Sequence, residues 1–136
     1  MKKSIIIIIS LIAGTGILAF FGFAYLFFFV GMEPIPSRTH QLDNLHGTQT
    51  VEIQARDDQK HIHGLLLEVH GNISDSLTFT FGVNDSTIYR TVQLTPGGVD
   101  FKYNADWYST LCFVTFEPTT DNIDGELQLE YKFFGD

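Results

Sequence analysis

The sequence predicts an all-β domain, a seven-stranded antiparallel β-sandwich of jelly-roll or Greek-key type, preceded by one N-terminal transmembrane helix. Three observations carry this prediction. After residue 48, apolar residues alternate with polar ones in short runs, as they do in strands that bury one face. Turn-forming residues separate these runs, and none of the runs shows helical periodicity. Before them, the 26 residues from 5 to 30 carry no charge.

The uncharged run 5–30 is long enough to cross a bilayer. As a helix it extends about 39 Å, whereas the hydrocarbon core of a bilayer measures about 30 Å. The alternative is a cleaved signal peptide, for which Gly-Phe-Ala at 22–24 offers a small-x-small cleavage site. Cleavage there leaves a chain that begins with six apolar residues, 25–30. We therefore favour a retained anchor over 1–30 that contacts lipid through residues 5–30.

The charges that flank this run predict its orientation. Lys2 and Lys3 precede it, and the first cation after it is Arg38. Cytoplasmic flanks of membrane spans carry the excess of lysine and arginine. The N-terminus is therefore expected in the cytoplasm, and the C-terminal domain in the periplasm or outside the cell.

Small residues at four-residue spacing predict how the helix packs. Ser10 precedes Gly14 by four positions, and Thr15 precedes Ala19 by four. Small residues at this spacing let helices approach closely, which favours self-association or docking on a larger membrane protein. The alternative is that these residues are ordinary members of a spanning helix.

Composition limits the partners of the remaining chain. Beyond the uncharged run, six Lys and Arg residues oppose all 16 Asp and Glu residues, a net charge of −10. Such a domain is not expected to bind nucleic acid or to dock flat on anionic lipid. The chain has one cysteine, Cys112, so it forms no internal disulfide. Because Cys112 lies in an apolar run, we expect it to be a buried small apolar group.

Residues 31–47 are expected to form an extracytoplasmic linker. Pro34 and Pro36 prevent the preceding helix from continuing, and no apolar periodicity follows them. The sandwich is expected over 48–136, with its phenylalanines in the core. Its strands are predicted at 51–56, 61–70, 77–81, 87–94, 99–103, 110–116 and 126–133.

The fourth predicted strand and the turn before it are specified further. Ile88, Val92 and Leu94 share one parity in this strand, which predicts that they share one face. Residues 82–85, Gly-Val-Asn-Asp, are typical of a turn.

A histidine pair is the first candidate site. His61 and His63 are two residues apart, so on a strand both imidazoles project to one face, where they can reach a single Zn²⁺ or Cu²⁺. His40 or His46 is a candidate third ligand if the linker folds back, and His70 joins the pair only if a bulge inverts the register. The alternative is that the pair consists of polar residues where a strand begins.

Oxygen-bearing side chains near the C-terminus form the second candidate site. Asp121 and Asp124 lie in a polar loop with Gly125, which resembles the start of a calcium-binding loop. Asp85 or Asp106 from another loop is a candidate further ligand for Ca²⁺. The alternative is a hairpin loop in which these residues supply only turn geometry.

Aromatic residues between two predicted strands form the third candidate, a binding surface. It consists of Tyr103, Asp106, Trp107 and Tyr108, and it includes the single tryptophan of the chain. Aromatic side chains on loops stack on sugars or anchor protein partners, because they offer a large area at little entropic cost. The alternative is that Trp107 fills the core beneath the loop.

The sequence gives little support to catalysis. It contains no nucleophile elbow, phosphate-binding loop, dinucleotide fingerprint or zinc-protease motif. We therefore expect a non-catalytic protein that needs no cofactor and acts as an interaction or accessory subunit of a membrane or envelope assembly. The alternative is a module that binds carbohydrate or a metal ion.

Overall fold

The structure, a computed structural model, describes residues 18–25, 35–84 and 86–136. The chain divides into two compact units, 1–34 and 35–136. In the first unit, residues 18–25 are helical. Among the described residues, no helix combines the length and the apolar character that crossing a membrane requires. Most of the predicted span lies outside the described residues, including Ser10, Gly14 and Thr15, while Ala19 belongs to the helical segment.

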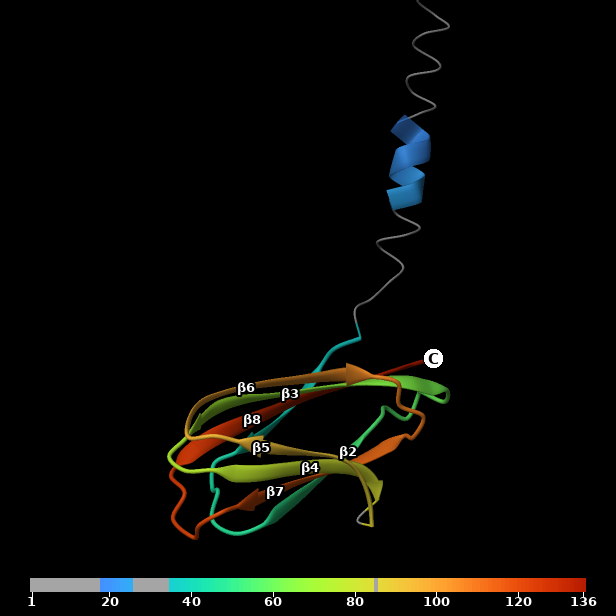
Figure 1. The fold of residues 1–136 in the computed structure, drawn as a ribbon. Coiled ribbons are helices and arrows are strands. Elements are labelled where there is room, and N and C mark those ends of the chain that lie inside the picture. The colour runs from blue at the N-terminus through green and yellow to red at the C-terminus, as the bar shows by residue number, and fades with distance from the viewer. Residues whose placement is uncertain (1–17, 26–34, 85) are drawn as a thin grey trace, which may run out of the picture. The chain divides into compact units, whose positions relative to one another are not determined.

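The second unit is a two-layer antiparallel β-sandwich (Figure 1). One sheet has the order β1-β8-β3-β6 and the other the order β2-β7-β4-β5. The strands are β1 (Arg38–Leu42), β2 (Gln49–Gln54), β3 (Ile62–Ile73), β4 (Leu77–Asn84), β5 (Thr87–Leu94), β6 (Gly97–Ala105), β7 (Leu111–Pro118) and β8 (Gly125–Gly135). The predicted all-β sandwich is confirmed, with β2 to β8 in the place of the seven predicted strands.

The strand pairing is that of one long hairpin rolled up on itself. β4 pairs with β5, β3 with β6, β2 with β7 and β1 with β8, all antiparallel. Successive strands of each arm alternate between the two sheets, and the pairs β3–β8 and β4–β7 complete each sheet. Double-sheet jelly rolls are built in this way.

The eighth strand lies where the sequence predicted a linker. β1 pairs with β8 from Arg38↔Tyr131 to Leu42↔Leu127, so the prediction of a linker over 31–47 is wrong for residues 38–42. The sequence pattern does not indicate this strand, because it is short and lies at the edge of a sheet, where Leu42 is its one buried side chain. Its order comes from the backbone of β8, and it leaves no alternating pattern in the sequence.

The space between the sheets is filled by aromatic and aliphatic side chains. The ring of Phe79 lies 5.2 Å from that of Phe101, 5.3 Å from Phe116 and 5.5 Å from Phe81, measured between centroids. Cys112 is fully buried among these groups, as predicted. Burial raises the pKa of its thiol to about 12, so the thiol is neutral at physiological pH.

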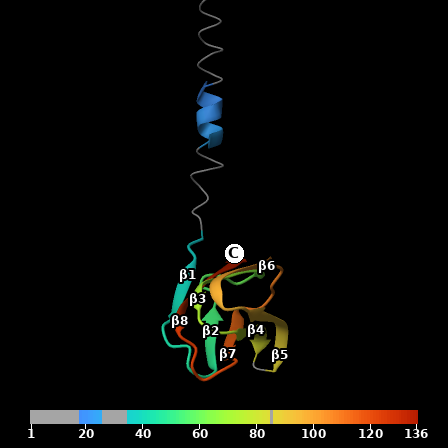
Figure 2. The same ribbon diagram turned by 60° about the vertical axis from the view of Figure 1, so that its left-hand side comes forward.

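Antiparallel pairing gathers the connections at two opposite ends of the sandwich (Figures 1 and 2). The proximal end holds residues 35–37, where the chain passes into β1, together with 55–61, the β4–β5 connection, 106–110 and the C-terminus. Backbone hydrogen bonds join its segments, from Lys60 N to Asp136 O at 2.6 Å and from Trp107 N to His63 O at 3.4 Å. The distal end holds the loops 43–48, 74–76, 95–96 and 119–124.

Candidate binding surface at the proximal end

The exposed apolar side chains of the sandwich gather at its proximal end. Within residues 35–84 and 86–136, the large apolar side chains that remain exposed are Val83 at 38%, Ile88 at 60%, Tyr89 at 60% and Tyr108 at 80%. Val83, Ile88 and Tyr89 flank the β4–β5 connection, and Tyr108 belongs to the loop between β6 and β7. We call these four residues the proximal patch.

A bulge in the β4–β5 ribbon creates one half of this patch. Phe81 pairs with Arg90 and Gly82 pairs with Ile88, so Tyr89 is an extra residue without a partner in β4. Gly82 permits this pairing, because a Cβ there would collide with the carbonyl oxygen of Thr87. The predicted turn at 82–85 is therefore wrong, since β4 continues to residue 84.

The bulge also corrects the predicted face of Ile88. In a regular strand, every second residue lies on the same face, so Ile88 would share a face with Val92 and Leu94. Val92 is partly buried and Leu94 is fully buried. Ile88 is 60% exposed, because the extra residue shifts the parity of the strand between it and Val92. Tyr89 is also 60% exposed, although its ring centroid lies 6.2 Å from that of Phe81.

Trp107 lies beneath Tyr108, the remaining residue of the proximal patch. Its side chain is 3% exposed, and its Nε1 donates a hydrogen bond to the carbonyl oxygen of Leu111 at 3.2 Å. Its ring meets that of Tyr89 edge to face, with centroids 5.8 Å apart. Fixing Trp107 in this way leaves the next residue, Tyr108, pointing outward.

Tyr103 lies beneath both halves. Its ring centroid is 4.8 Å from that of Phe81 and 6.1 Å from that of Tyr89. Its hydroxyl is buried and makes no hydrogen bond of normal geometry with the described residues. Burial, followed by the Tyr89 hydroxyl, raises the pKa of Tyr103 to about 12. Tyr103 therefore stays protonated at neutral pH and serves as packing.

The predicted binding surface is thus divided between core and solvent. Tyr103 and Trp107 are buried, whereas Asp106 and Tyr108 are exposed. Asp106, Trp107 and Tyr108 line a shallow depression of about 290 Å³ together with Val83 and Tyr89, which the sequence analysis did not single out. The turn-forming residues before β5 offered a signal for Val83 and Tyr89, because a hairpin there places the residues on either side of it at the end of the sheet.

The histidine pair lies at the same end but outside the depression. His61 and His63 are both exposed, and His61 Nδ1 lies 3.2 Å from a carboxylate oxygen of Asp136. The register of β3 shifts between Ile62 and Gly64. Across the described ranges, no three His, Cys, Asp or Glu side chains gather in an arrangement that could hold a metal ion.

The other candidate ligands lie elsewhere. His46 Nδ1 is 2.9 Å from the carbonyl oxygen of Asp121, which places it at the distal end. His70 Nδ1 is 3.2 Å from a carboxylate oxygen of Asp100. Asp121 and Asp124 belong to the distal loop 119–124, so Asp106 at the proximal end is not their neighbour. Asp85 lies outside the described residues.

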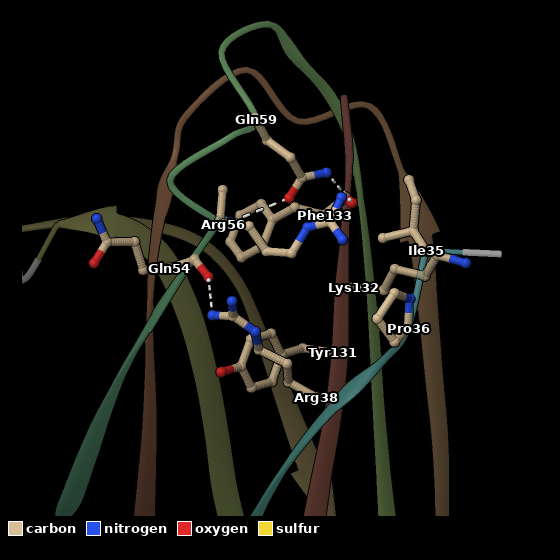
Figure 3. Close-up of a pocket in the computed structure, with 10 residues that line it drawn as sticks. Ile35, Pro36, Arg38, Gln54, Arg56, Gln59, Tyr131, Lys132 and Phe133 are labelled. Carbon is tan, nitrogen blue, oxygen red and sulfur yellow. Dashed lines mark hydrogen bonds between the residues drawn. The ribbon is translucent and has the colours of Figure 1, made fainter. Parts of the chain in front are cut away.

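A small cavity between β1, β2 and β8 is structural (Figure 3). Its volume of about 10 Å³ is the size of a single water molecule. The buried Gln59 bridges it by donating to the carbonyl oxygen of Phe133 at 3.0 Å and accepting from the backbone N of Arg56 at 3.2 Å. Arg38 Nη1 donates to the carbonyl oxygen of Gln54 at 3.4 Å, so the two sheets are joined along this edge.

Comparison with known proteins gives likeness of fold and nothing finer. No family model and no curated protein matches this chain. The pre-peptidase C-terminal domain of a collagenase from Bacillus anthracis aligns at 11% identity and a TM-score of 0.47, covering 71% of this chain and 88% of that chain. The mitogen from Yersinia pseudotuberculosis aligns at 14% identity and a TM-score of 0.40, covering 77% of this chain and 90% of that chain.

Dimeric latent PorU from Porphyromonas gingivalis aligns at 6% identity and a TM-score of 0.43. The alignment covers 74% of this chain and 13% of that much longer chain. At such identities and scores, these likenesses carry no inference about activity. The description of this chain as a β-sandwich rests on its own strand pairing.

Proposed function

We propose that this chain is a single-pass, membrane-anchored protein whose β-sandwich lies outside the cytoplasm and works by binding. In this proposal it is a non-catalytic interaction or accessory subunit of a membrane or envelope assembly. The observation that supports the proposal is the proximal patch, since the large exposed apolar side chains of the described sandwich all lie at one end, and such grouping is typical of contact surfaces in otherwise polar domains. The uncharged run 5–30 after Lys2 and Lys3 supports the anchor and its orientation.

Fractionation of the full chain tests the anchor. Produced in a bacterial host, the chain is expected in the membrane pellet, and it should resist extraction at alkaline pH. Protease added outside spheroplasts should degrade the sandwich. Changing Lys2 and Lys3 to Glu should weaken this orientation, because it removes the positive charges before the span. A soluble, processed chain that lacks its first residues by mass spectrometry would refute the anchor.

Cross-linking tests the accessory role. The full chain extracted in detergent from its native membranes is expected to co-purify with a membrane or envelope protein in a fixed ratio. A photoreactive amino acid at Tyr108, in the proximal patch, would map the contact, and one at Gln93, an exposed residue of β5 outside the patch, is the control. Purification of the chain alone, with no cross-linked partner in native membranes, would contradict an accessory role.

Carbohydrate binding is the second candidate, and the depression beside Tyr89 and Tyr108 favours it. Two exposed phenol rings near a carboxylate at Asp106 offer stacking faces and a hydrogen-bond acceptor for a sugar. Because Trp107 lies under this depression, its fluorescence should change when a glycan binds. Titration with a panel of envelope polysaccharides tests this, and Tyr108→Ala should abolish the change. An unchanged spectrum across the panel would reject this candidate.

A further inference from the structure

The free edge of β6 is the longest regular sheet edge of the described sandwich. Four strands lie at sheet edges: β1 with five residues, β2 with six, β5 with eight and β6 with nine. The bulge at Tyr89 interrupts β5, whereas the pairing of β6 with β3 shows no shift of register. On its other side, β6 has no partner among the described strands. Unpaired backbone N–H and C=O groups along a long, regular edge are a template for a strand of another chain.

Two opposite charges lie symmetrically about the middle of this edge. Phe101 is the central residue of β6, with Asp100 immediately before it and Lys102 immediately after it. The side chains of Asp100 and Lys102 share the outer face of the sheet and are 87% and 63% exposed. When β6 pairs antiparallel with its own copy about Phe101, all nine residues have partners. Asp100 of each copy then lies directly opposite Lys102 of the other.

Strand β3 extends this pattern of charges. Lys102 Nζ lies 2.5 Å from Glu68 Oε1. On the same face, Asp100 Oδ1 lies 3.2 Å from His70 Nδ1. In the self-paired arrangement, Glu68 and Lys102 of one copy are therefore followed across the sheet by Asp100 of the other. Negative and positive side chains alternate along this row, and the two-fold symmetry repeats it.

The same charges select the register of the pairing. Sliding one copy by two residues places Lys102 opposite Lys102 in one direction and Asp100 opposite Asp100 in the other. Like charges directly opposite each other destabilise a pair of strands. Sliding by a single residue sets core-facing side chains beside solvent-facing ones. The pairing centred on Phe101 is therefore the favoured one.

The inner face of β6 offers the second copy an apolar contact. Phe101 is partly buried, and it lines a hollow of about 240 Å³ together with Val92, Leu94 and Val99. In the self-paired arrangement, Phe101 lies opposite Phe101 of the second copy, and aromatic pairs that lie opposite each other stabilise a sheet. A ring that is partly exposed in the single chain is thereby brought against another ring.

We infer that two copies of this chain associate through β6, about a two-fold axis at Phe101. Their β1-β8-β3-β6 sheets then form one continuous sheet of eight strands. The partner that this edge fits is a second copy, because Asp100 and Lys102 complement themselves in an antiparallel pair. The inference does not depend on the proposed anchor, since it uses residues of the sandwich alone.

Light scattering of the full chain in detergent, corrected for bound detergent, measures the association. The unmodified chain should be a dimer. Asp100→Lys sets two ammonium groups opposite each other and Lys102→Asp sets two carboxylates, so each variant alone should raise the dissociation constant about ten-fold or more. An equimolar mixture of the two variants restores opposite charges at both pairs and should form a dimer again. Glu117→Lys, at an exposed position on β7, changes the charge as much as Asp100→Lys and should leave the dimer unchanged.

Cysteine cross-linking measures the register. Gly98 and Asn104 are both exposed, and in the central register Gly98 of one copy lies opposite Asn104 of the other. Chains with Gly98→Cys, mixed with chains that carry Asn104→Cys, should form a disulfide-linked dimer under mild oxidation. Replacing the second chain with one that carries Gln93→Cys, an exposed position on β5, should prevent the cross-link. Cys112 is fully buried and stays unreactive in the folded chain.

Two results would overturn the inference. A full chain that is monomeric in detergent would leave Lys102 as a charge that protects an open edge from pairing. Dimers that persist in each single variant alone would place the contact outside β6. Neither result bears on the anchor or on the accessory role, which fractionation and cross-linking in native membranes test separately.

Discussion

At Gly82, strands β4 and β5 approach so closely that any side chain would meet the backbone of Thr87. We predict that Gly82→Ala lowers the free energy of unfolding by about 1–3 kcal/mol, because backbone must move to admit the methyl group. Gly98→Ala is the matched control, since a Cβ there has no neighbour within 4 Å. Urea unfolding measures both variants. Equal stability of the two would contradict the close approach that produces the bulge.

Because of Cys112, we predict that the free energy of unfolding falls at alkaline pH. Its pKa rises from 9.0 in a solvated thiol to about 12 in the folded chain, so the unfolded chain releases its proton first. The contribution of the neutral Cys112 thiol to the free energy of unfolding is complete below pH 9 and is lost as the pH rises toward 12. At about 1.4 kcal/mol for each pH unit, the loss reaches roughly 4 kcal/mol.

Urea unfolding at pH 7.5, 9 and 10 measures this effect. Cys112→Ala should be less stable at neutral pH, because it leaves a small cavity, but its stability should change less between pH 9 and 10. Above pH 10, Tyr103 adds a loss of the same sign in both proteins, since its pKa is also raised to about 12. A thiol that reacts equally fast in the folded and the denatured chain would argue against this account.

At the scale of the element, β1 depends on one buried side chain. Leu42 is 3% exposed, whereas His40 on the same strand is exposed. Leu42→Ala should therefore lower the free energy of unfolding by about 2–4 kcal/mol, and His40→Ala should change it by less than about 0.5 kcal/mol. Thermal or urea unfolding measures the difference. A similar small effect of both changes would mean that β1 does not stabilise the fold.

The elements also show what a sequence can reveal. Strands such as β4 and β8 were predictable because each buries one face, so that Phe79 and Phe81, or Leu127 and Leu129, recur at every second position. β1 was not predictable, because its order comes from pairing with residues 85 to 93 positions away. The parity of Ile88 was mispredicted because counting by two assumes a ladder without a bulge.

The proximal patch was only half predictable for a related reason. Tyr108 was found from the aromatic loop 103–108, in which each residue is near the others along the chain. Tyr89 reaches that loop through the rolled pairing, which brings together the start of β5 and the end of β6. The turn-forming residues before β5 indicate that Tyr89 lies near the end of a sheet, but topology alone decides which loop it meets there.

At the scale of the whole molecule, the rolled hairpin predicts slow folding. The pairs β1–β8 and β2–β7 join residues far apart in sequence, and folds dominated by such contacts need milliseconds to seconds to form. Trp107 provides the probe, because it is the single tryptophan and is buried in the folded chain. Stopped-flow refolding of the full chain in detergent, followed by the blue shift of Trp107, should fall in this range. Complete refolding within microseconds would contradict it.

Tension on the chain at Ile35 would reach the sandwich through β1. This strand runs from the proximal end toward the distal end, side by side with β8 over the five pairs from Arg38↔Tyr131 to Leu42↔Leu127. A force directed back along the strand therefore loads these five pairs in shear, all at once, and does not peel them apart singly. The first strand should therefore resist a force applied at Ile35 more strongly than a strand whose pairs separate one at a time.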